Sequence, residues 1–463
     1  MANRVRMVTV LAGGLALAVG WQPSAWAGAG DARQGGGAAE TRMPLRLTLA
    51  DAIARGLAQN VAAVLADEEV RAAGGARIAA RSGVLPSVTA GIGAAREKIS
   101  LDEYGFPVAP GESPLLGPFD VVKAQLTVSQ ALLDVSAIER ARAGGHRLAA
   151  ARLSRSDTRD LVVATCAALY LRAVAEESRV EAAQAELATA DAVGRLAHDM
   201  KQAGTVPGID VLRADVQLAA QRQRLIRAEN ERDRQRLALA KAIGLPLGDG
   251  FELADRVPYA ELAGLQLDEA LVQALATRSD LKSATASLNA AEDDLRAAIG
   301  QTLPSLHVDA NVAAVGPSTS TTRRTYALAA ALRVPLFEGG RAQGQIAQSR
   351  AALEQQRARV ADLKARVELE VRTSLLDLDA AARQVEVAGG ARSLAEQQLA
   401  QAQDRFAAGV ASNIEVVQAQ QALAEASENY IGSLLAHNLA KLSLARALGV
   451  VESRAMRYLG GEE

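Results

Sequence analysis

The sequence is short of cysteine and of aromatic residues. Among 463 residues there is one cysteine, Cys166, and phenylalanine, tyrosine and tryptophan together make up 3%. A single cysteine excludes an intrachain disulfide framework, and a lone thiol makes a poor metal site. Because Cys166 lies in a run of helix-forming residues, we expect it to be a small buried hydrophobic side chain. The sequence therefore predicts neither disulfides nor a thiolate metal centre.

Catalytic motifs are also missing. The histidines fall at unrelated places in the chain: His146, His198, His307 and His437. No Cys/His/Asp cluster has the spacing of a metal site, and there is neither a nucleophile elbow nor a phosphate-binding loop. The formal net charge is −2. Such a near-neutral balance gives no reason to expect binding to nucleic acid. We predict no enzyme activity, no cofactor and no nucleic-acid partner.

Only the N-terminus has a long apolar run with charged flanks. Arg4 and Arg6 precede the apolar stretch from Val8 to Val19, which is shorter than the roughly 20 residues of a membrane-spanning helix. Ala25-Trp26-Ala27 supplies the small-x-small pattern of a cleavage site, so we predict a cleaved export signal over 1–27. The residue directly after the predicted cleavage site is Gly28 rather than cysteine, so no N-terminal lipid anchor is expected. The mature chain is then either soluble outside the cytoplasm or held in a membrane by β-strands.

The remaining sequence contains an internal repeat. Four short segments recur, the first two 218 positions later and the last two 205 positions later: 49–53 at 267–271, 85–87 at 303–305, 204–212 at 409–417, and 242–245 at 447–450. The offset changes between the second and third segments, where the first copy has a longer loop, Ser100–Pro118, than the second, Val315–Thr325. A period near 200 is too long for a solenoid and indicates a duplicated half. The predicted parts are a signal (1–27), a flexible N-terminal segment (28–45), repeat one (46–245), a linker (246–264), repeat two (265–450) and a C-terminal tail (451–463).

Two intervals without proline predict very long helices. Ser136–Lys201 and Glu338–Gln403 are rich in alanine, leucine and charge, and each would extend about 100 Å at 1.5 Å per residue. Shorter helices are expected at Thr48–Ser82, where Thr48 and Asp51 form a capping box, and at Gly208–Ile243. Laid end to end, these two would match the long helix beside them. Helices of this length must pack along one another as coiled coils.

Four segments of period two predict β-strands. They are Ser87–Ala94, Val122–Ser129, Leu306–Val312 and Tyr326–Val334. One face is apolar, and the other carries Lys123, His307, Asp309 and Arg333. This alternation is typical of a transmembrane barrel with a watery lumen, and equally of a half-buried soluble sheet. Two hairpins cannot close a barrel, so the membrane interpretation requires several chains. The candidates for an interfacial aromatic girdle are few: Tyr104, Phe106, Phe119 and Tyr326.

The doubled order of helix, hairpin, long helix, tip and helix resembles the TolC-like outer-membrane efflux protein family. Three segments carry the resemblance: Leu47-Thr48-Leu49-x-Asp51-Ala52-Ile53, Val334-Pro335-Leu336-Phe337-Glu338-Gly339-Gly340, and Arg405-Phe406-x-x-Gly409-x-x-Ser412-x-Ile414-Glu415-Val416. The resemblance covers about 45–450. It implies an α+β membrane protein in the outer membrane: a homotrimer that shares one twelve-stranded β-barrel in outer-membrane lipid, with a long α-helical coiled-coil barrel in the periplasm.

The resemblance also implies functional residues at the helix-to-helix tips. Gly204 and Gly409, with Arg405 and Ser412, are candidates for docking a periplasmic adaptor. Asp210 and Glu415, just past the tips, match a carboxylate ring that closes the tunnel in family proteins. Where some members have a second acid one turn later, this chain has Arg213 and Gln418, so its constriction should be weaker or differently charged. Without the family, an acid in the first turn of a helix is explained by the helix dipole alone.

The function implied is that of a passive exit duct. It would receive cargo from an inner-membrane transporter and a periplasmic adaptor of a tripartite efflux pump, and the alternative of the same class is type I protein secretion. A periplasmic helical adaptor or scaffold is the alternative of another class, although no stretch supplies the compact β-rich domains of an adaptor. The scarcity of histidine, methionine and cysteine disfavours a dedicated metal pathway.

Overall fold

The computed structural model describes residues 45–105, 107–109, 111–248, 250–255, 260, 262 and 265–459. The predicted signal (1–27) lies outside these residues, and so does the predicted N-terminal segment except Leu45, which begins a short strand. Phe106, a candidate girdle residue, and the last four residues of the predicted tail also lie outside them. The following description concerns the described residues alone.

The first half of the chain contains four helices. They are α1 (Leu49–Gln59), α2 (Val61–Ser82), α3 (Val135–Gln202) and α4 (Gly208–Ala242). The capping box of Thr48 and Asp51 opens α1, as predicted. The single helix expected over Thr48–Ser82 is wrong, because Asn60 has an extended backbone between α1 and α2. Its side-chain oxygen accepts from Ala62 N at 2.9 Å and its amide donates to the Ala242 carbonyl at 3.0 Å, which stabilises the break.

The second half has the same order of helices. They are α5 (Leu267–Thr277), α6 (Ser279–Gly300), α7 (Arg341–Ala407) and α8 (Asn413–Ala447). Their lengths of 11, 22, 67 and 35 residues compare with 11, 22, 68 and 35 in the first half. α7 begins three residues later than predicted because Gly339 and Gly340 adopt positive φ. The predicted C-terminal tail includes a further helix, α9 (Val451–Tyr458).

Four long strands form one antiparallel sheet in the order β2-β3-β5-β6. They are β2 (Ser87–Ser100), β3 (Leu115–Leu133), β5 (Ser305–Gly316) and β6 (Arg323–Arg333). β2 and β3 continue well past the predicted ends, and a 3-10 turn, η1 (Leu101–Tyr104), connects them. The extra residues of the first copy therefore lengthen its hairpin as well as its loop. Two short strands, β1 (Leu45–Leu47) and β4 (Phe251–Leu253), pair in parallel elsewhere.

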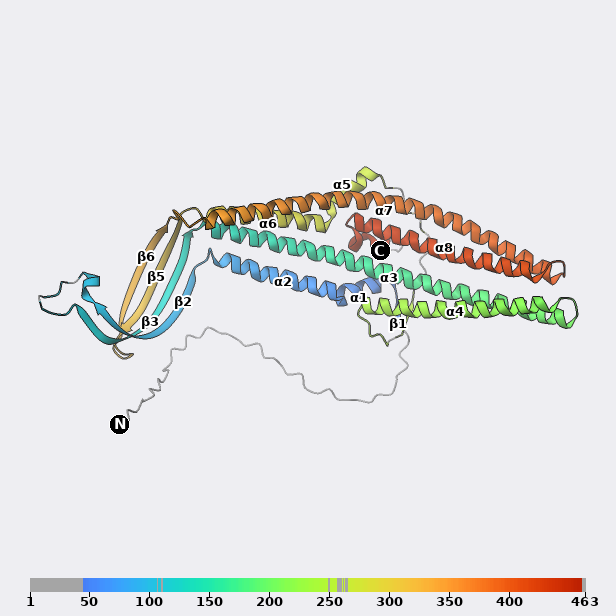
Figure 1. The fold of residues 1–463 in the computed structure, drawn as a ribbon, viewed down its shortest axis with the longest axis horizontal. Coiled ribbons are helices and arrows are strands. Elements are labelled where there is room, and N and C mark those ends of the chain that lie inside the picture. The colour runs from blue at the N-terminus through green and yellow to red at the C-terminus, as the bar shows by residue number, and fades with distance from the viewer. Residues whose placement is uncertain are drawn as a thin grey trace, which may run out of the picture. The chain divides into compact units, whose positions relative to one another are not determined.

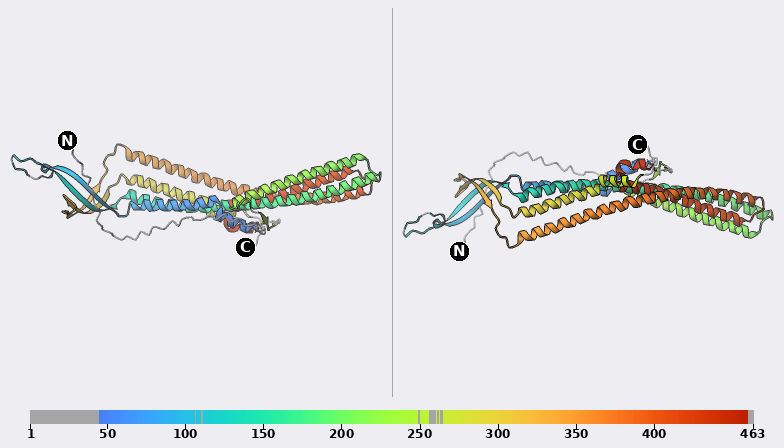
Figure 2. Two further views of the ribbon diagram at one scale, coloured as in Figure 1. Left: turned by 90° about the horizontal axis from the view of Figure 1, so that it is seen from below. Right: turned by 90° about the horizontal axis from the view of Figure 1, so that it is seen from above.

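The sheet stands at one end of the described unit and the helices extend away from it (Figure 1). Next to the sheet the helices lie side by side in the order α2-α3-α6-α7, which repeats the strand order. Further away, α3 with α4 and α7 with α8 form two long hairpins (Figure 2). α2 and α4 thus lie end to end along α3, as the sequence predicted. No helix among the described residues is both long and apolar enough to cross a bilayer.

The largest core lies at mid-length, where α1, α5 and α9 pack on the long helices. Tyr170 and Cys166 on α3 are fully buried there, and burial raises the pKa of the Cys166 thiol to about 11. The expectation of a small buried side chain at Cys166 is confirmed. Gly56 on α1 leaves the room that this side chain needs, since an added Cβ would lie 2.4 Å from Cys166 Sγ. Away from this core and a smaller one near the helix tips, the helices bury narrow stripes made mostly of alanine and valine.

Candidate functional site

The two helical hairpins end in turns of the same geometry. Gly204 and Gly409 have φ of +75° and +73°. The amide of the following residue bonds back five residues, from Thr205 to the Met200 carbonyl at 2.9 Å and from Val410 to the Arg405 carbonyl at 3.0 Å. This is the Schellman arrangement, in which a left-handed residue ends a helix. A Cβ added at either glycine would meet no other atom within 4 Å. Both turns are therefore open to contact from outside.

A small apolar core joins the two hairpins close to their tips. It takes residues from four helices: Val193 and Ala197 of α3, Val211 and Ala214 of α4, Leu399, Ala402 and Phe406 of α7, and Val416 and Ala419 of α8. Phe406 is its largest member and is 1% exposed. Beside it, the amide of the buried Asn413 donates to the Asp210 carbonyl at 2.7 Å, which ties the start of α8 to the start of α4.

Each of the two predicted gate acids has an arginine partner. The Asp210 side chain is 7% exposed, and its Oδ1 lies 3.2 Å from Nη1 of Arg213. Glu415 is 45% exposed, and its Oε2 lies 3.4 Å from Nε of Arg405. Arg405 was predicted to act in docking, so the structure brings together residues that the sequence assigned to separate roles. The four side chains sum to zero formal charge.

Apolar side chains are exposed around the same tips. Ile209 and Leu212 at the start of α4 are 51% and 61% exposed, and Val410 and Ile414 of the second tip are 69% and 42% exposed. Ser412 precedes α8 as its N-cap residue, and its exposed side chain makes no capping hydrogen bond. Exposed apolar groups rimmed by polar ones are typical of contact surfaces between proteins.

The sheet has one polar face, on which all four predicted lumen residues lie. Side chains alternate between faces, and the strand register places the odd-numbered residues of all four strands together. Lys123, His307, Asp309 and Arg333 therefore share a face, and Ser129 donates a 2.5 Å hydrogen bond to Asp309 across β3 and β5. The opposite face is apolar and widely exposed, with Ile92 at 86% and Tyr326 at 85%.

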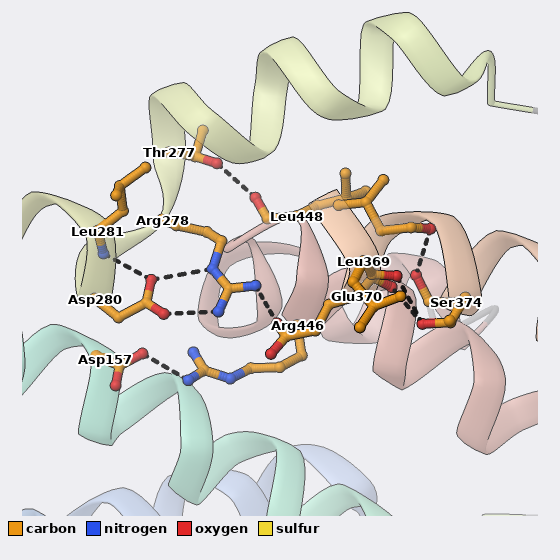
Figure 3. Close-up of polar contacts among 12 residues, drawn as sticks. Asp157, Thr277, Arg278, Asp280, Leu281, Leu369, Glu370, Ser374, Arg446 and Leu448 are labelled. Carbon is orange, nitrogen blue, oxygen red and sulfur yellow. Dashed lines mark hydrogen bonds and ion pairs between the residues drawn. The ribbon is translucent and has the colours of Figure 1, made fainter. Parts of the chain in front are cut away.

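A buried arginine clamps the break between α5 and α6 (Figure 3). Arg278 is 4% exposed and lies between two acids. Its Nε and Nη2 donate to Asp280 at 3.0 and 2.6 Å, and its Nη1 donates to Glu370 of α7. Burial raises the pKa of Asp280, but the Arg278 hydrogen bonds and charge outweigh this and leave that pKa below its ordinary value. On the neighbouring helices Arg446 pairs with Asp157 at 2.6 Å.

Sequence reasoning missed three of these features: the Phe406 core, the Asn413 tie and the Arg278 clamp. Phe406 directly follows Arg405 in the family-like segment 405–416. A single large apolar residue among alanines could have indicated a buried contact there. Arg278 follows Asn60 by 218 positions, the same offset that relates the first repeats. Its partner Glu370 lies 92 residues away, and no pattern connects the two. Across the described residues no three His, Cys, Asp or Glu side chains come close enough to hold a metal ion.

Long helices, one four-stranded sheet and paired tips define a class of outer-membrane export protein, and comparison with known proteins agrees. The outer membrane efflux protein family matches 54–245 and again 270–450. The chain belongs to this family, and it is a TolC-like protein of the outer membrane that serves efflux. Members of the family are channels rather than enzymes.

Individual relatives and structures agree with this assignment. The chain is 26% identical over 392 residues to the pyoverdine export outer membrane protein OpmQ of Pseudomonas aeruginosa, covering 82% of this chain and 80% of that protein. It is 25% identical to OpmQ of Pseudomonas putida, covering 86% and 84% of the two. The outer-membrane channel OprN shares its fold with a TM-score of 0.76 at 17% identity, over 87% and 89% of the chains. VceC of Vibrio cholerae also has this fold, with a TM-score of 0.76 at 20% identity, over 87% of this chain and 96% of VceC.

Proposed function

We propose that three copies of this chain form one continuous exit duct across the outer membrane and the periplasm. The observation that carries the proposal is the four-stranded sheet with two unpaired edges, β2 and β6, at the end of a much longer helical part. Unpaired edges invite pairing with another chain. Joined edge to edge, three copies would give a closed twelve-stranded barrel with the apolar face outward in lipid. The helices would then continue as a periplasmic tunnel.

The two halves of the chain support a ring of this kind. Helices of nearly equal length occur in the same order twice, and the family profile matches each half. We attribute this to an internal duplication, so that a trimer would present six similar helical hairpins around one axis. Six-fold pseudosymmetry closes a tunnel of long helices while the chain itself supplies only two hairpins.

We propose that the tips dock a periplasmic adaptor that belongs to an inner-membrane pump. The exposed apolar residues Ile209, Leu212, Val410 and Ile414 support this proposal, together with the open turns at Gly204 and Gly409. Arg405 and Ser412 lie on the same tip and would supply polar contacts at the rim of the interface. A tripartite arrangement explains why the tips stand far from the sheet.

We propose further that the duct narrows where Asp210 and Glu415 stand. Each acid is paired with an arginine, Arg213 or Arg405, so the constriction would be balanced in charge. The apolar core around Phe406 would hold the hairpins of one chain together and keep the mouth narrow at rest. Opening would then require the hairpins to separate at this core.

The cargo that the relatives suggest is a small molecule. Both OpmQ proteins export pyoverdine by name. We therefore prefer small-molecule efflux to type I protein secretion for this chain.

The test of the proposal is oligomeric state together with conductance. Chemical cross-linking in mild detergent should stop at three chains, and the purified trimer should form discrete channels in a planar bilayer. A largest species of one or two chains would overturn the shared barrel. Extraction without detergent would support a periplasmic scaffold instead.

A further inference from the structure

The polar face of the sheet carries an unbalanced pair of cations where the four-stranded part of the sheet ends, away from the helices. Beyond the next residue pair only β2 and β3 remain paired. Lys123 of β3 lies opposite Val315 of β5, and Val315 lies opposite Arg323 of β6. Lys123 and Arg323 therefore stand in one row across the sheet, on the same face, with their Cα atoms roughly 10 Å apart at two strand spacings. Gly93 is the β2 member of this row. Both cationic side chains are exposed.

Acidic residues do not neutralise this row. Neither Lys123 nor Arg323 forms an ion pair with any residue that the structure describes. Asp309, on the same face, accepts from Ser129 and lies six residue pairs along the sheet from the Lys123 row. Glu97 shares the face but lies four residues beyond Gly93, roughly 13 Å along β2. The closer pair of Arg96 and Asp120, at 3.8 Å, belongs to the opposite, apolar face.

We propose that Lys123 and Arg323 form a cationic ring inside the outer mouth of the duct that draws anionic cargo outward. The inference rests on the proposed trimer, in which the row repeats three times and sets six cations around one water-filled lumen. Charges of one sign in a confined channel with low-dielectric walls raise the local concentration of the opposite ion. The favoured cargo class is small molecules that carry carboxylate, phosphate or sulfonate groups.

The neighbouring arginine provides a control that the sequence itself supplies. Arg324 pairs with Ala314 and so lies on the apolar face, one residue from Arg323. Replacing either arginine by glutamine removes the same charge from nearly the same place in the chain. Only the Arg323 substitution acts on the lumen. A change in general surface potential would make the two variants equal.

A cysteine reporter measures the potential beside the ring. Gln125 lies on the same face as Lys123, two residues nearer the helices along β3, where it pairs with Gly91 and Ala313. Gln125→Cys therefore places a thiol beside the row of cations. Trimers in proteoliposomes are reacted with sulfonatoethyl and trimethylammonioethyl methanethiosulfonates, which are anionic and cationic, and the rate ratio is normalised to a free thiol. Cys166 does not interfere because it is buried, with its pKa raised to about 11. If this reporter does not assemble, Thr325→Cys on β6 reports from the same row.

At low salt the anionic reagent should react about tenfold faster than the cationic one, after normalisation to the free thiol. This normalised rate ratio should fall to within about twofold of the free thiol in the Lys123→Gln/Arg323→Gln double variant and in 1 M salt, where screening acts within about 3 Å. Arg324→Gln should leave it unchanged. A wild-type ratio near one, or equal effects of Arg323→Gln and Arg324→Gln, would overturn the ring. Absence of three-chain oligomers and of conductance would instead overturn the proposed function.

Discussion

At the scale of single residues, the buried charge of Arg278 lies at the break between α5 and α6. Asn60 stabilises the corresponding break between α1 and α2 with neutral hydrogen bonds, whereas Arg278 stabilises its break by binding two carboxylates. A buried charge is tolerated only when its partners are in place. The break in the second half is therefore held by an interaction that depends on ionisation, whereas the break in the first half is held by neutral hydrogen bonds.

The Asp280 carboxylate should make stability depend on acid. Its pKa is lowered in the folded protein, so its contribution is complete above the unfolded pKa near 4 and is lost as pH falls through the folded value. At pH 7, Asp280→Asn should lower the free energy of unfolding by about 2 kcal/mol, since a hydrogen-bonded charge is removed. Thermal unfolding followed by circular dichroism should show this difference in full at pH 7 and a smaller difference at pH 3.

Asp362→Asn is the matched control. Asp362 also pairs with an arginine, Arg366, but both side chains are exposed, at 69% and 59%. Its removal should change stability by less than about 0.5 kcal/mol. Equal effects of the two substitutions would show that Arg278 does not depend on Asp280.

The tip glycines should be sensitive to bulk rather than to strain. A residue other than glycine at φ of +73° costs roughly 1–2 kcal/mol, and the surroundings of Gly409 are empty. If the chain forms the proposed trimer and docks an adaptor at this turn, Gly409→Trp should leave the amount of folded trimer unchanged but abolish export, whereas Gly409→Ala should keep most of the export. Drug accumulation in cells and immunoblots of membrane fractions measure the two quantities. Export at wild-type levels by Gly409→Trp would argue against docking at this turn.

At the scale of elements, close helix contacts depend on small side chains. Gly144 of α3 faces α2, where an added Cβ would lie 3.1 Å from the Cβ of Ala80, whereas a Cβ on Gly145 would meet nothing within 4 Å. The adjacent glycines thus have different roles in one helix.

This difference predicts different changes in stability for the two glycines. Gly145→Ala should raise the free energy of unfolding by about 1 kcal/mol, because alanine is the better helix former. Gly144→Ala should lose that gain, since α2 and α3 must move apart. Melting temperatures of the two variants and of wild type should rank accordingly. Equal stabilisation by both would show that α2 yields without cost.

The core around Phe406 is the element-level candidate for keeping the hairpins together. Phe406→Ala removes its largest side chain, and such a change in a buried core costs about 3–5 kcal/mol. Because the mid-length core is separate, the trimer should persist while the tips splay, and single-channel conductance should rise. Val410→Ala, at an exposed position on the same tip, should not alter conductance. Conductance unchanged by Phe406→Ala would exclude this core from holding the mouth closed.

Most of the helices and strands could be predicted from the periodicity of apolar residues and from the positions of proline and glycine. Proline-free stretches identified α3 and α7 within a few residues, and Gly204 and Gly409 marked their ends. The breaks at Asn60 and Arg278 could not be predicted, because both residues are compatible with a helix and only contacts with distant segments select the extended backbone. The partner of Glu415 could not be predicted for a related reason, since Arg405 belongs to the preceding helix and the pair forms only across the turn. The Asp210 partner differs, because Arg213 follows Asp210 by three residues and this spacing makes helical side chains neighbours.

At the scale of the whole molecule, two charge patterns stand at opposite ends. The tips pair their acids with arginines, whereas the polar face of the sheet carries Lys123, Arg323 and Arg333 against Asp309 and Glu97. If the copies assemble as proposed, cargo would pass a balanced constriction first and a cationic mouth last. The mouth would therefore decide more of the charge selectivity than the tips do.

The equal helix lengths restrict how this gene can change. α3 and α7 have 68 and 67 residues, and α4 and α8 have 35 each. Seven residues added to α3 alone would push its tip about 10 Å past that of α7, and Asn413 would lose its contact with Asp210. A lineage that must span a wider gap between its membranes therefore has to lengthen α3, α4, α7 and α8 together. Insertions and deletions in related genes should accordingly occur in sets, at matching places in both halves.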